Sequence, residues 1–423
     1  MKRLVRRSSV VLAAAVIAGA SVTAPTQAAA PPPAPVTVWV ASLQNSAAVP
    51  VNAGSGSVGQ PVPVEDPQTV VITPNGRTAL FTTSGTLALT PVDTVTRTVG
   101  QAMQVNTFGP MAVSPDGRTV WVGENWQMQA EIVQKVNLAT RAVTPIGLGL
   151  GTAADVVLTP DGKTLFVSGR FEDDRVGVLP VNTATNQRGA LIPFATVGAM
   201  TMTPNGRTLF VSTGSAVVPI DVATRAKKQA IAVAATDLAA NPRGTTVEAT
   251  TAQGLVSINV ATRSVTAPIP GTAGALRVEV GPYGDRAFLR LNNDLVPVWL
   301  TTGRVGAPVG LATFNFAISP TQAPVAAFTA DPGLHGMATT FDASGSAARS
   351  GQLASYAWRF GDGSTKVTTG PSVSHVYANA GSYSVSLTVT DSYGTSTTKV
   401  FTGHQVVRNG GPSARTARTI TVG

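Results

Sequence analysis

The side chains best suited to chemistry gather in two segments, GENWQMQAEI at 123–132 and SGRFEDDRV at 168–176. Both segments combine aromatic rings with charged groups, as binding surfaces commonly do. We expect the two segments to meet on one rim of the molecule and to form a binding site there. Its candidate residues are Glu124, Trp126, Arg170, Phe171, Glu172, Asp173 and Asp174.

Two other interpretations of these segments stay open. The charged run is also typical of a solvated loop with a local ion pair, in which Asp174 pairs with Arg170 or Arg175. A carboxylate pair for glycoside hydrolysis, or a calcium site, is the remaining alternative. Adjacent carboxylates on a loop are poorly placed to act as a rigid acid and base, which disfavours the hydrolase.

Histidine and cysteine are scarce. The three histidines, His335, His375 and His404, all lie beyond residue 320, and the chain has no cysteine. The earlier residues therefore lack the side chains for Ser/His/Asp catalysis, for histidine-bound metals and for thiol nucleophiles. We predict no catalytic residue, no metal site and no cofactor, and we interpret His375 as a strand residue.

A repeated six-residue phrase indicates the elements that position these segments. TPNGRT occurs at 73–78 and at 203–208, with SPDGRT at 114–119, TPDGKT at 159–164 and weaker copies at 241–246 and 281–286. Proline, then Asn or Asp, then glycine are the residues of a tight turn. Apolar runs flank the phrase, so it predicts a hairpin turn between two strands.

The spacing of the phrase predicts a β-propeller. Successive copies lie 38 to 45 residues apart, and a second phrase of the type VNLATRAV recurs in phase. Each period thus holds four short strands, the content of one propeller blade. Residues 37–64 and 311–320 read as complementary parts of one further blade. We predict seven blades over residues 36–320, one of them closed by both ends, because closure pairs exposed strand edges. Six or eight blades stay open because the fifth and sixth copies are degraded.

The best copies of the repeat carry a family resemblance. TPDGKTLFVS at 159–168, followed by strands of the type VNTAT, resembles the YVTN family of seven-bladed β-propellers in secreted and surface-layer proteins. The resemblance covers about two-thirds of the chain. It implies the fold, whereas the function stays open because propellers host enzymes, binders and scaffolds alike.

A second domain is predicted over residues 323–407. WRFGDG at 358–363, HVY at 375–377 and GSYSV at 381–385 resemble the PKD domain, an immunoglobulin-like β-sandwich, with Trp358 and Phe360 in its core. Some relatives of this domain bind calcium, but AARSG at 347–351 has no carboxylate here. Asp342 and Asp362 offer too few ligands, so we expect no metal. The basic tail, 408–423, is predicted to be flexible.

The first residues are typical of a signal peptide. Residues 1–28 contain a basic start, an apolar run and small residues before the predicted cleavage site, and 29–35 are a Pro/Ala-rich linker. An uncleaved anchor is the alternative, and export by the general or twin-arginine route stays open. The formal net charge is +9, but Lys and Arg are dispersed, which disfavours nucleic acid as a partner. We expect a secreted or cell-surface protein without membrane attachment after cleavage.

Three functions follow from these features. We favour a secreted, non-enzymatic binding or scaffold protein whose partner is a cell-wall polymer, a glycan or a surface protein. The alternative, implied by resemblance to lactonases and lyases on this fold, is a hydrolase or lyase acting in the central channel. It requires Asp or Glu from three or more blades to converge there, and an apolar or Thr/Ser-lined channel would exclude it. A purely structural surface-layer component is the third. The oligomeric state stays open.

Overall fold

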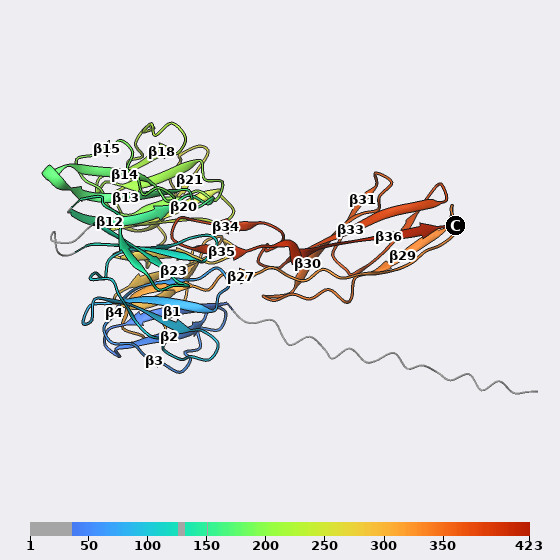
Figure 1. Ribbon diagram of the computed structural model, residues 1–423, viewed down its shortest axis with the longest axis horizontal. Helices are drawn as coiled ribbons and strands as arrows, with labels where there is room; N and C mark the ends of the chain where they lie inside the picture. Colours follow the sequence, from blue (N-terminus) through green and yellow to red (C-terminus); the bar gives the residue numbers. More distant parts are fainter. Residues whose placement is uncertain (1–35, 126–131, 150) are drawn as a thin grey trace, which may run out of the picture. The chain divides into compact units, whose positions relative to one another are not determined.

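The structure is a computed structural model that describes residues 36–125, 132–149 and 151–423. The predicted signal peptide, the linker and Trp126 lie outside these ranges. Within them the chain forms strands and two single turns of 3-10 helix, η1 (Glu172–Asp174) and η2 (Pro412–Ala414). The predicted fold class is confirmed: an all-β chain with a seven-bladed propeller followed by an immunoglobulin-like sandwich (Figure 1).

Seven antiparallel sheets form the blades, and we number them in chain order. Each begins at its inner strand and proceeds outward by hairpins, except blade 1, whose inner strand comes last in the chain. Blade 1 is β26 (Thr313–Ile318), β1 (Thr37–Ser42), β2 (Ala47–Asn52) and β3 (Val62–Pro63); blade 2 is β4 (Pro67–Ile72), β5 (Thr78–Thr83), β6 (Ala88–Asp93) and β7 (Met103–Gln104); blade 3 is β8 (Met111–Val113), β9 (Thr119–Gly123), β10 (Val133–Asn137) and β11 (Val143–Pro145); blade 4 is β12 (Gly151–Leu158), β13 (Thr164–Phe171), β14 (Val176–Asn182) and β15 (Ile192–Pro193); blade 5 is β16 (Met200–Met202), β17 (Thr208–Ser212) and β18 (Val217–Asp221); blade 6 is β19 (Ala235–Ala240), β20 (Thr246–Thr251) and β21 (Gly254–Asn259); blade 7 is β22 (Arg277–Val280), β23 (Arg286–Leu291), β24 (Asp294–Trp299) and β25 (Arg304–Val305).

The repeated phrase forms the turn between the first two strands of a blade. In blade 2 the Gly76 amide donates to the Thr73 carbonyl at 2.8 Å, and the Arg77 amide donates to Asn75 Oδ1 at 3.0 Å. Gly76 has a φ of 69°, a conformation that side chains other than Asn and Asp rarely adopt. The turns therefore mark one face of the propeller, which we call the turn face. The connections from second to third strands lie on the opposite face, which we call the free face.

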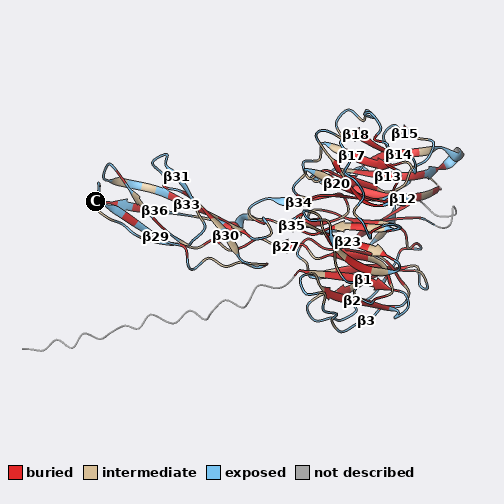
Figure 2. Ribbon diagram, turned by 180° about the vertical axis from the view of Figure 1, so that it is seen from behind, coloured by how far each residue is buried: buried red, intermediate tan, exposed pale blue. Residues whose placement is uncertain are grey.

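Blade 1 joins the two ends of the propeller. β1 pairs with β26 in antiparallel register, with Val40 opposite Phe316, so the segments that the sequence analysis assigns to one blade lie in one sheet. Figure 2 shows that buried residues dominate the strands of all blades, because neighbouring blades pack face to face. Because β1 and β26 pair, the ring is closed and leaves no exposed strand edge between its first and last segments.

Blade 4 extends further than the other blades toward the free face. Its strands β12, β13 and β14 have eight, eight and seven residues, against three to six for the first three strands elsewhere. The hairpin between β13 and β14 encloses η1, so this blade carries the segment with the predicted site residues. At the end of β13, buried and exposed residues alternate as in a regular strand, and the Phe171 side chain points into the core.

The sandwich consists of two sheets. One contains β28 (Thr329–Asp331), β29 (Ala338–Asp342) and β32 (Ser372–Val376); the other contains β31 (Thr365–Thr368), β30 (Leu353–Arg359), β33 (Gly381–Asp391) and β36 (Arg415–Val422). Its core is aromatic, with Trp358 and Phe360 both 1% exposed, as the sequence predicts. Tyr377 is also buried and donates its hydroxyl proton to the Phe360 carbonyl at 3.0 Å.

The last residues of the chain differ from the prediction. Residues 408–423, predicted to be a flexible tail, contain β36, which pairs with β33 over eight residues and buries Ile420 and Val422. The alternation of apolar residues at the end of ARTITVG explains this strand. Residues 399–407, the end of the predicted second domain, form a hairpin of β34 (Lys399–Phe401) and β35 (Val406–Asn409), which joins β27 (Thr321–Gln322) in a sheet separate from the two sandwich sheets.

Candidate functional site

The central channel is lined by one position of the repeat. This position lies four residues before the first residue of each turn, on the inner strand of a blade or directly before it. Its seven occupants all line a single cavity of about 430 Å³. From blade 1 to blade 7 they are Asn315, Thr69, Pro110, Asp155, Ala199, Asp237 and Arg277. The wall is thus small and uncharged around blades 3 and 5, and charged at blades 4, 6 and 7.

A loop from beyond the propeller closes this cavity on the turn face. We call residues 402–405, between β34 and β35, the plug. The plug accepts hydrogen bonds from the inner-strand amides of four consecutive blades. The Ile72 amide donates to Gln405 Oε1 at 2.7 Å, and the Val113 amide donates to the His404 carbonyl at 2.8 Å. The Leu158 amide donates to the Gly403 carbonyl at 2.8 Å, and the Met202 amide donates to the Thr402 carbonyl at 3.0 Å. Gln405 Nε2 also donates to the Ile318 carbonyl of blade 1 at 2.8 Å. One residue of the plug thus serves each of blades 2 to 5.

The packing of the plug leaves little freedom. Phe401 and Val406, which flank it, are buried in the same cluster as Leu158 and Val167 of blade 4. Gly403 has a φ of 120°, and a Cβ atom there would lie 2.8 Å from Val157 Cγ1. Glycine is therefore required where the loop passes closest to the wall. The cavity is consequently a blind funnel that opens toward the free face, with His404 and Gln405 in its floor.

Asp155 joins the plug to two blades. Its Oδ1 lies 2.9 Å from His404 Nε2, and its Oδ2 accepts the Met200 amide proton of blade 5 at 2.7 Å. Burial alone would lower the pKa of His404, but the charge and hydrogen bond of Asp155, with the charge of Glu279, outweigh burial and raise it. The raised pKa favours the protonated form of the imidazole, in which the contact with Asp155 is an ion pair.

Two further carboxylates lie in the wall. Asp237 Oδ2 accepts the Val278 amide proton of blade 7 at 2.9 Å, and Glu279 accepts a hydrogen bond from Arg277 at 2.9 Å. Burial raises the pKa of both carboxyl groups, although the charge of Arg277 acts in the opposite direction. Carboxylates from three blades thus line one cavity. Each also takes a hydrogen bond that holds the ring of blades together or fixes a neighbouring guanidinium.

No group of three or more His, Asp or Glu side chains within the described ranges is arranged to hold a metal ion. In the sandwich, Asp362 Oδ2 lies 2.6 Å from Nε2 of His375, which stacks on Phe360 with ring centroids 4.2 Å apart. Asp342 bonds locally to the amide and hydroxyl of Ser344. These two aspartates therefore serve local structure.

The predicted rim residues divide into exposed and buried groups. Arg170 and Asp174 form an ion pair of 3.1 Å, with side chains 54% and 79% exposed, and Glu172 is exposed beside them. Phe171, predicted to belong to the binding site, is 4% exposed, so its ring lies in the core and not on the rim surface. Glu124 is 3% exposed. The side chain of Asp173 lies outside the description, as Trp126 does.

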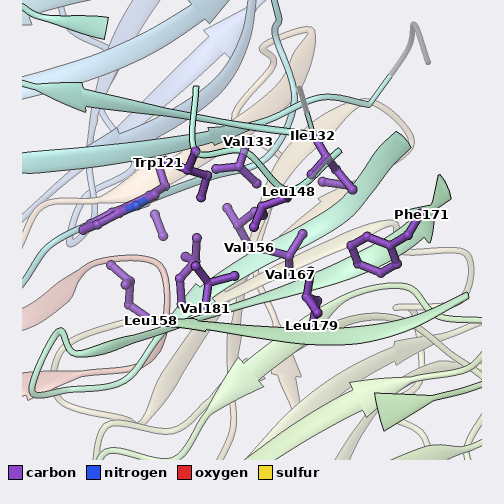
Figure 3. Packing of buried hydrophobic residues seen from close by; sticks show 14 of the residues in the cluster. Trp121, Ile132, Val133, Leu148, Val156, Leu158, Val167, Phe171, Leu179 and Val181 are labelled. Carbon is purple, nitrogen blue, oxygen red and sulfur yellow. The ribbon is translucent and has the colours of Figure 1, made fainter. Parts of the chain in front are cut away.

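Phe171 supports the projecting hairpin from within. Its ring belongs to the core cluster of blades 3 and 4 with Ile132, Leu148 and Leu179, as Figure 3 shows. Burial of an aromatic side chain of this size stabilises a structure by about 1.5–3 kcal/mol. The hairpin with Arg170, Glu172 and Asp174 is consequently a packed projection on the free face.

A groove runs beside this projection. Its volume is about 420 Å³, and it is lined by residues of blades 3, 4 and 5 that include Arg170, Val176 and Thr196. Asn125 and Ala154 line both this groove and the channel cavity. The projecting hairpin, the groove and the mouth of the cavity therefore form one continuous surface on the free face.

The sequence analysis did not find the channel residues. The signal was present in the repeat, because Asp155, Asp237 and Arg277 occupy one column of otherwise apolar inner strands. His404 had no such signal, since no spacing rule links a residue of the second domain to the propeller. Counting histidines by domain therefore missed the one that enters the channel.

The second domain matches a known family. Residues 321–406 match the family model described as PKD domain. The chain is 44% identical over 81 residues to a microbial collagenase of Vibrio alginolyticus, and 44% identical over 54 residues to collagenase ColA of Bacillus cereus. These alignments cover 19% and 13% of this chain but only 10% and 5% of the collagenases, so it spans a small part of their length.

Solved structures match the propeller. Hydrazine synthase of Kuenenia stuttgartiensis is 15% identical with a TM-score of 0.54, and the match covers 69% of this chain and 98% of that one. The periplasmic gluconolactonase of Pseudomonas aeruginosa is 16% identical with a TM-score of 0.51, covering 67% and 99%. At such identities the likeness concerns the fold. Among the described residues no helix is long and apolar enough to cross a membrane. The chain is thus a β-propeller followed by a PKD domain.

Proposed function

We propose that this is a secreted, extracellular binding protein whose free face recognises a surface partner, a cell-wall polymer, glycan or surface protein. The observation that carries the proposal is the projecting hairpin of blade 4 beside its groove. Arg170 lines the groove, and the exposed charges of Glu172 and Asp174 lie on the same hairpin. The buried Phe171 ring packs beneath this projection. A preformed surface of this kind binds with little loss of conformational entropy.

Several features support this proposal over catalysis. The plug closes the turn face of the channel, and the oxygens of Asp155 already bond to the Val156 and Met200 amides and to His404. The PKD domain and the signal-peptide sequence are compatible with a protein that acts outside the cell. The repeat similarity to the YVTN family of secreted and surface-layer proteins points the same way.

The test is a pull-down of the full mature chain with insoluble cell-wall material and a panel of polysaccharides. We expect saturable binding that falls at least about fivefold in Arg170→Ala, because an interfacial arginine contributes more than about 1 kcal/mol. Arg77→Ala is the matched control, since this exposed arginine lies in a turn on the opposite face. Retention of full binding by Arg170→Ala and its loss in Arg77→Ala would reverse the assignment of the face.

One observation favours a second candidate, a hydrolase or lyase in the channel. The condition set from the sequence, carboxylates of three or more blades at one place, corresponds to Asp155, Asp237 and Glu279 in the cavity, and His404 adds an imidazole. A screen of lactone and ester substrates on the full chain tests it. Turnover that disappears in His404→Gln would establish this function, whereas activity that is absent or unchanged in that variant would exclude the imidazole as a catalytic group.

A further inference from the structure

Two ionisable side chains of the channel cavity form no ion pair with any described residue. Four of the six ionisable groups that line it form pairs, Arg277 with Glu279 at 2.9 Å and His404 with Asp155 at 2.9 Å. The remaining two are Arg290 and Asp237. Within the described ranges neither forms an ion pair. Arg290 donates only to the neutral Asn293 side chain and the Phe314 carbonyl, and Asp237 accepts from backbone amides.

These two groups lie on adjoining parts of the wall. Asp237 bonds to the amide of Val278, and the residue before it, Arg277, lies opposite Arg290 in the register of β22 and β23. Burial and the like charge of Arg277 lower the pKa of Arg290, while burial raises the pKa of Asp237 against the charge of Arg277. A buried charge without an ion-pair partner is stabilised by a group of opposite sign.

Three polar atoms beside them are also unsatisfied. Within the described ranges, the guanidinium Nε atoms of Arg277 and Arg290 and the Oδ1 atom of Asn315 are buried without a hydrogen-bond partner. In a folded protein the great majority of such atoms are paired, so three in one wall call for an explanation. They lie at blades 1 and 7.

Small apolar residues line the cavity at blades 3 to 5, on both sides of the Asp155–His404 pair. They are Pro110, Ala154 and Ala199, and Val71 and Met111 lie beside them. The volume of about 430 Å³ lies in the range of small-molecule sites. The cavity thus offers a cation and an anion without ion-pair partners, and a surface for an apolar group.

We propose that the cavity binds a small zwitterion of the amino-acid type, with its carboxylate at Arg290, its ammonium group at Asp237 and an apolar side chain against Pro110 and Ala199. This goes beyond the recognition of a surface partner on the free face. A simple carboxylate satisfies Arg290 and leaves Asp237 unpaired, and a simple amine does the reverse while meeting two guanidinium groups. Only a ligand that carries both charges can pair with both side chains.

Calorimetric titration of the full mature chain with the standard amino acids, one at a time and up to about 10 mM, tests this proposal. We expect saturable binding of at least one with an apolar side chain. Its N-acetyl derivative lacks the ammonium group and its amide lacks the carboxylate, and each should bind at least about tenfold more weakly, because each loses a charge-assisted hydrogen bond. No binding by any amino acid, or equal binding of either derivative, would overturn the proposal.

Variants locate the site. Arg290→Gln and Asp237→Asn should each weaken binding at least about tenfold, and Asn retains an oxygen that accepts the Val278 amide proton. Arg77→Gln and Asp331→Asn are matched controls on exposed residues away from the cavity and should bind like the wild type. Unaltered binding in both cavity variants would place the ligand elsewhere. The pull-down of surface material depends on Arg170 and is unaffected by either result, so failure of one proposal is distinguishable from failure of the other.

Discussion

His404 links the second domain to the propeller through its ion pair with Asp155. The pKa of this imidazole is raised in the folded protein, so the folded state binds more protons than the unfolded state above the ordinary pKa of 6.5. The stabilisation is complete below that pH and disappears as the pH rises through the folded pKa. We therefore expect His404→Gln to reduce the free energy of unfolding at pH 5 by on the order of 1–3 kcal/mol, and by less at pH 9.

Chemical denaturation at both pH values measures this difference. The groups that face His404 are Asp155, Glu279 and Arg277, and the two carboxylates act in favour of the proton while Arg277 opposes it. His335→Gln is the control, because this imidazole is exposed and lies in the sandwich, where its Nδ1 atom contacts the Gly423 carbonyl. A loss of stability in His404→Gln that is the same at pH 5 and pH 9 would show that the imidazole contributes by packing alone.

The hairpin of β34 and β35 is the element that determines whether the channel is closed. At its tip Gly403 combines a positive φ with close contact to Val157. Gly403→Ala should lower the stability by about 1–3 kcal/mol more than Gly310→Ala, because Gly310 has a φ of 78° but open space around its Cβ position. The pair of variants separates the steric cost from the backbone cost. Equal losses of melting temperature in the two would contradict the tight fit of the plug.

β36 is the element that the sequence analysis treats as a flexible tail. In the structure Ile420 is 8% exposed, while Thr419 on the same strand is exposed. Ile420→Ala should therefore cost about 2–5 kcal/mol in the sandwich, and Thr419→Ala almost nothing. The near-ultraviolet signal of the buried Trp358 follows the unfolding of this domain. A flexible tail would instead leave both variants as stable as the wild type.

Most of the fold could be predicted from local sequence patterns. The phrase with Asn75 and Gly76 repeats with the period of a blade, so the turns, the blade content and the all-β class followed from residues close together in sequence. The burial of Phe171 was not predicted because the strands of blade 4 are longer than those of the other blades. A period-2 pattern of apolar residues does not indicate where a strand ends. The pairing of His404 with Asp155 was not predictable, since it joins residues 249 apart in sequence.

At the scale of the whole molecule, we expect the plug to couple the unfolding of the propeller to that of the sandwich. It supplies acceptors to Ile72, Val113, Leu158 and Met202. Leaving a buried amide without a partner costs about 1–3 kcal/mol. These acceptors come from the hairpin of β34 and β35, which is held by the pairing of β35 with β27 and by the hydrogen bond from Asn409 to Gln322. We therefore expect the loss of either domain to remove support from the other.

Calorimetric unfolding of the full chain should accordingly show a single transition whose calorimetric and van't Hoff enthalpies agree. Replacing the plug, residues 402–405, with Ser-Gly-Ser-Gly removes the Gln405 side chain and the ordered carbonyls. This variant should unfold in two separate transitions, the lower one assigned by fluorescence to the four propeller tryptophans, Trp39, Trp121, Trp126 and Trp299. The same replacement at residues 184–187, an exposed turn of blade 4, should leave one transition. Two transitions already in the wild type would mean that the plug closes the channel without coupling the domains.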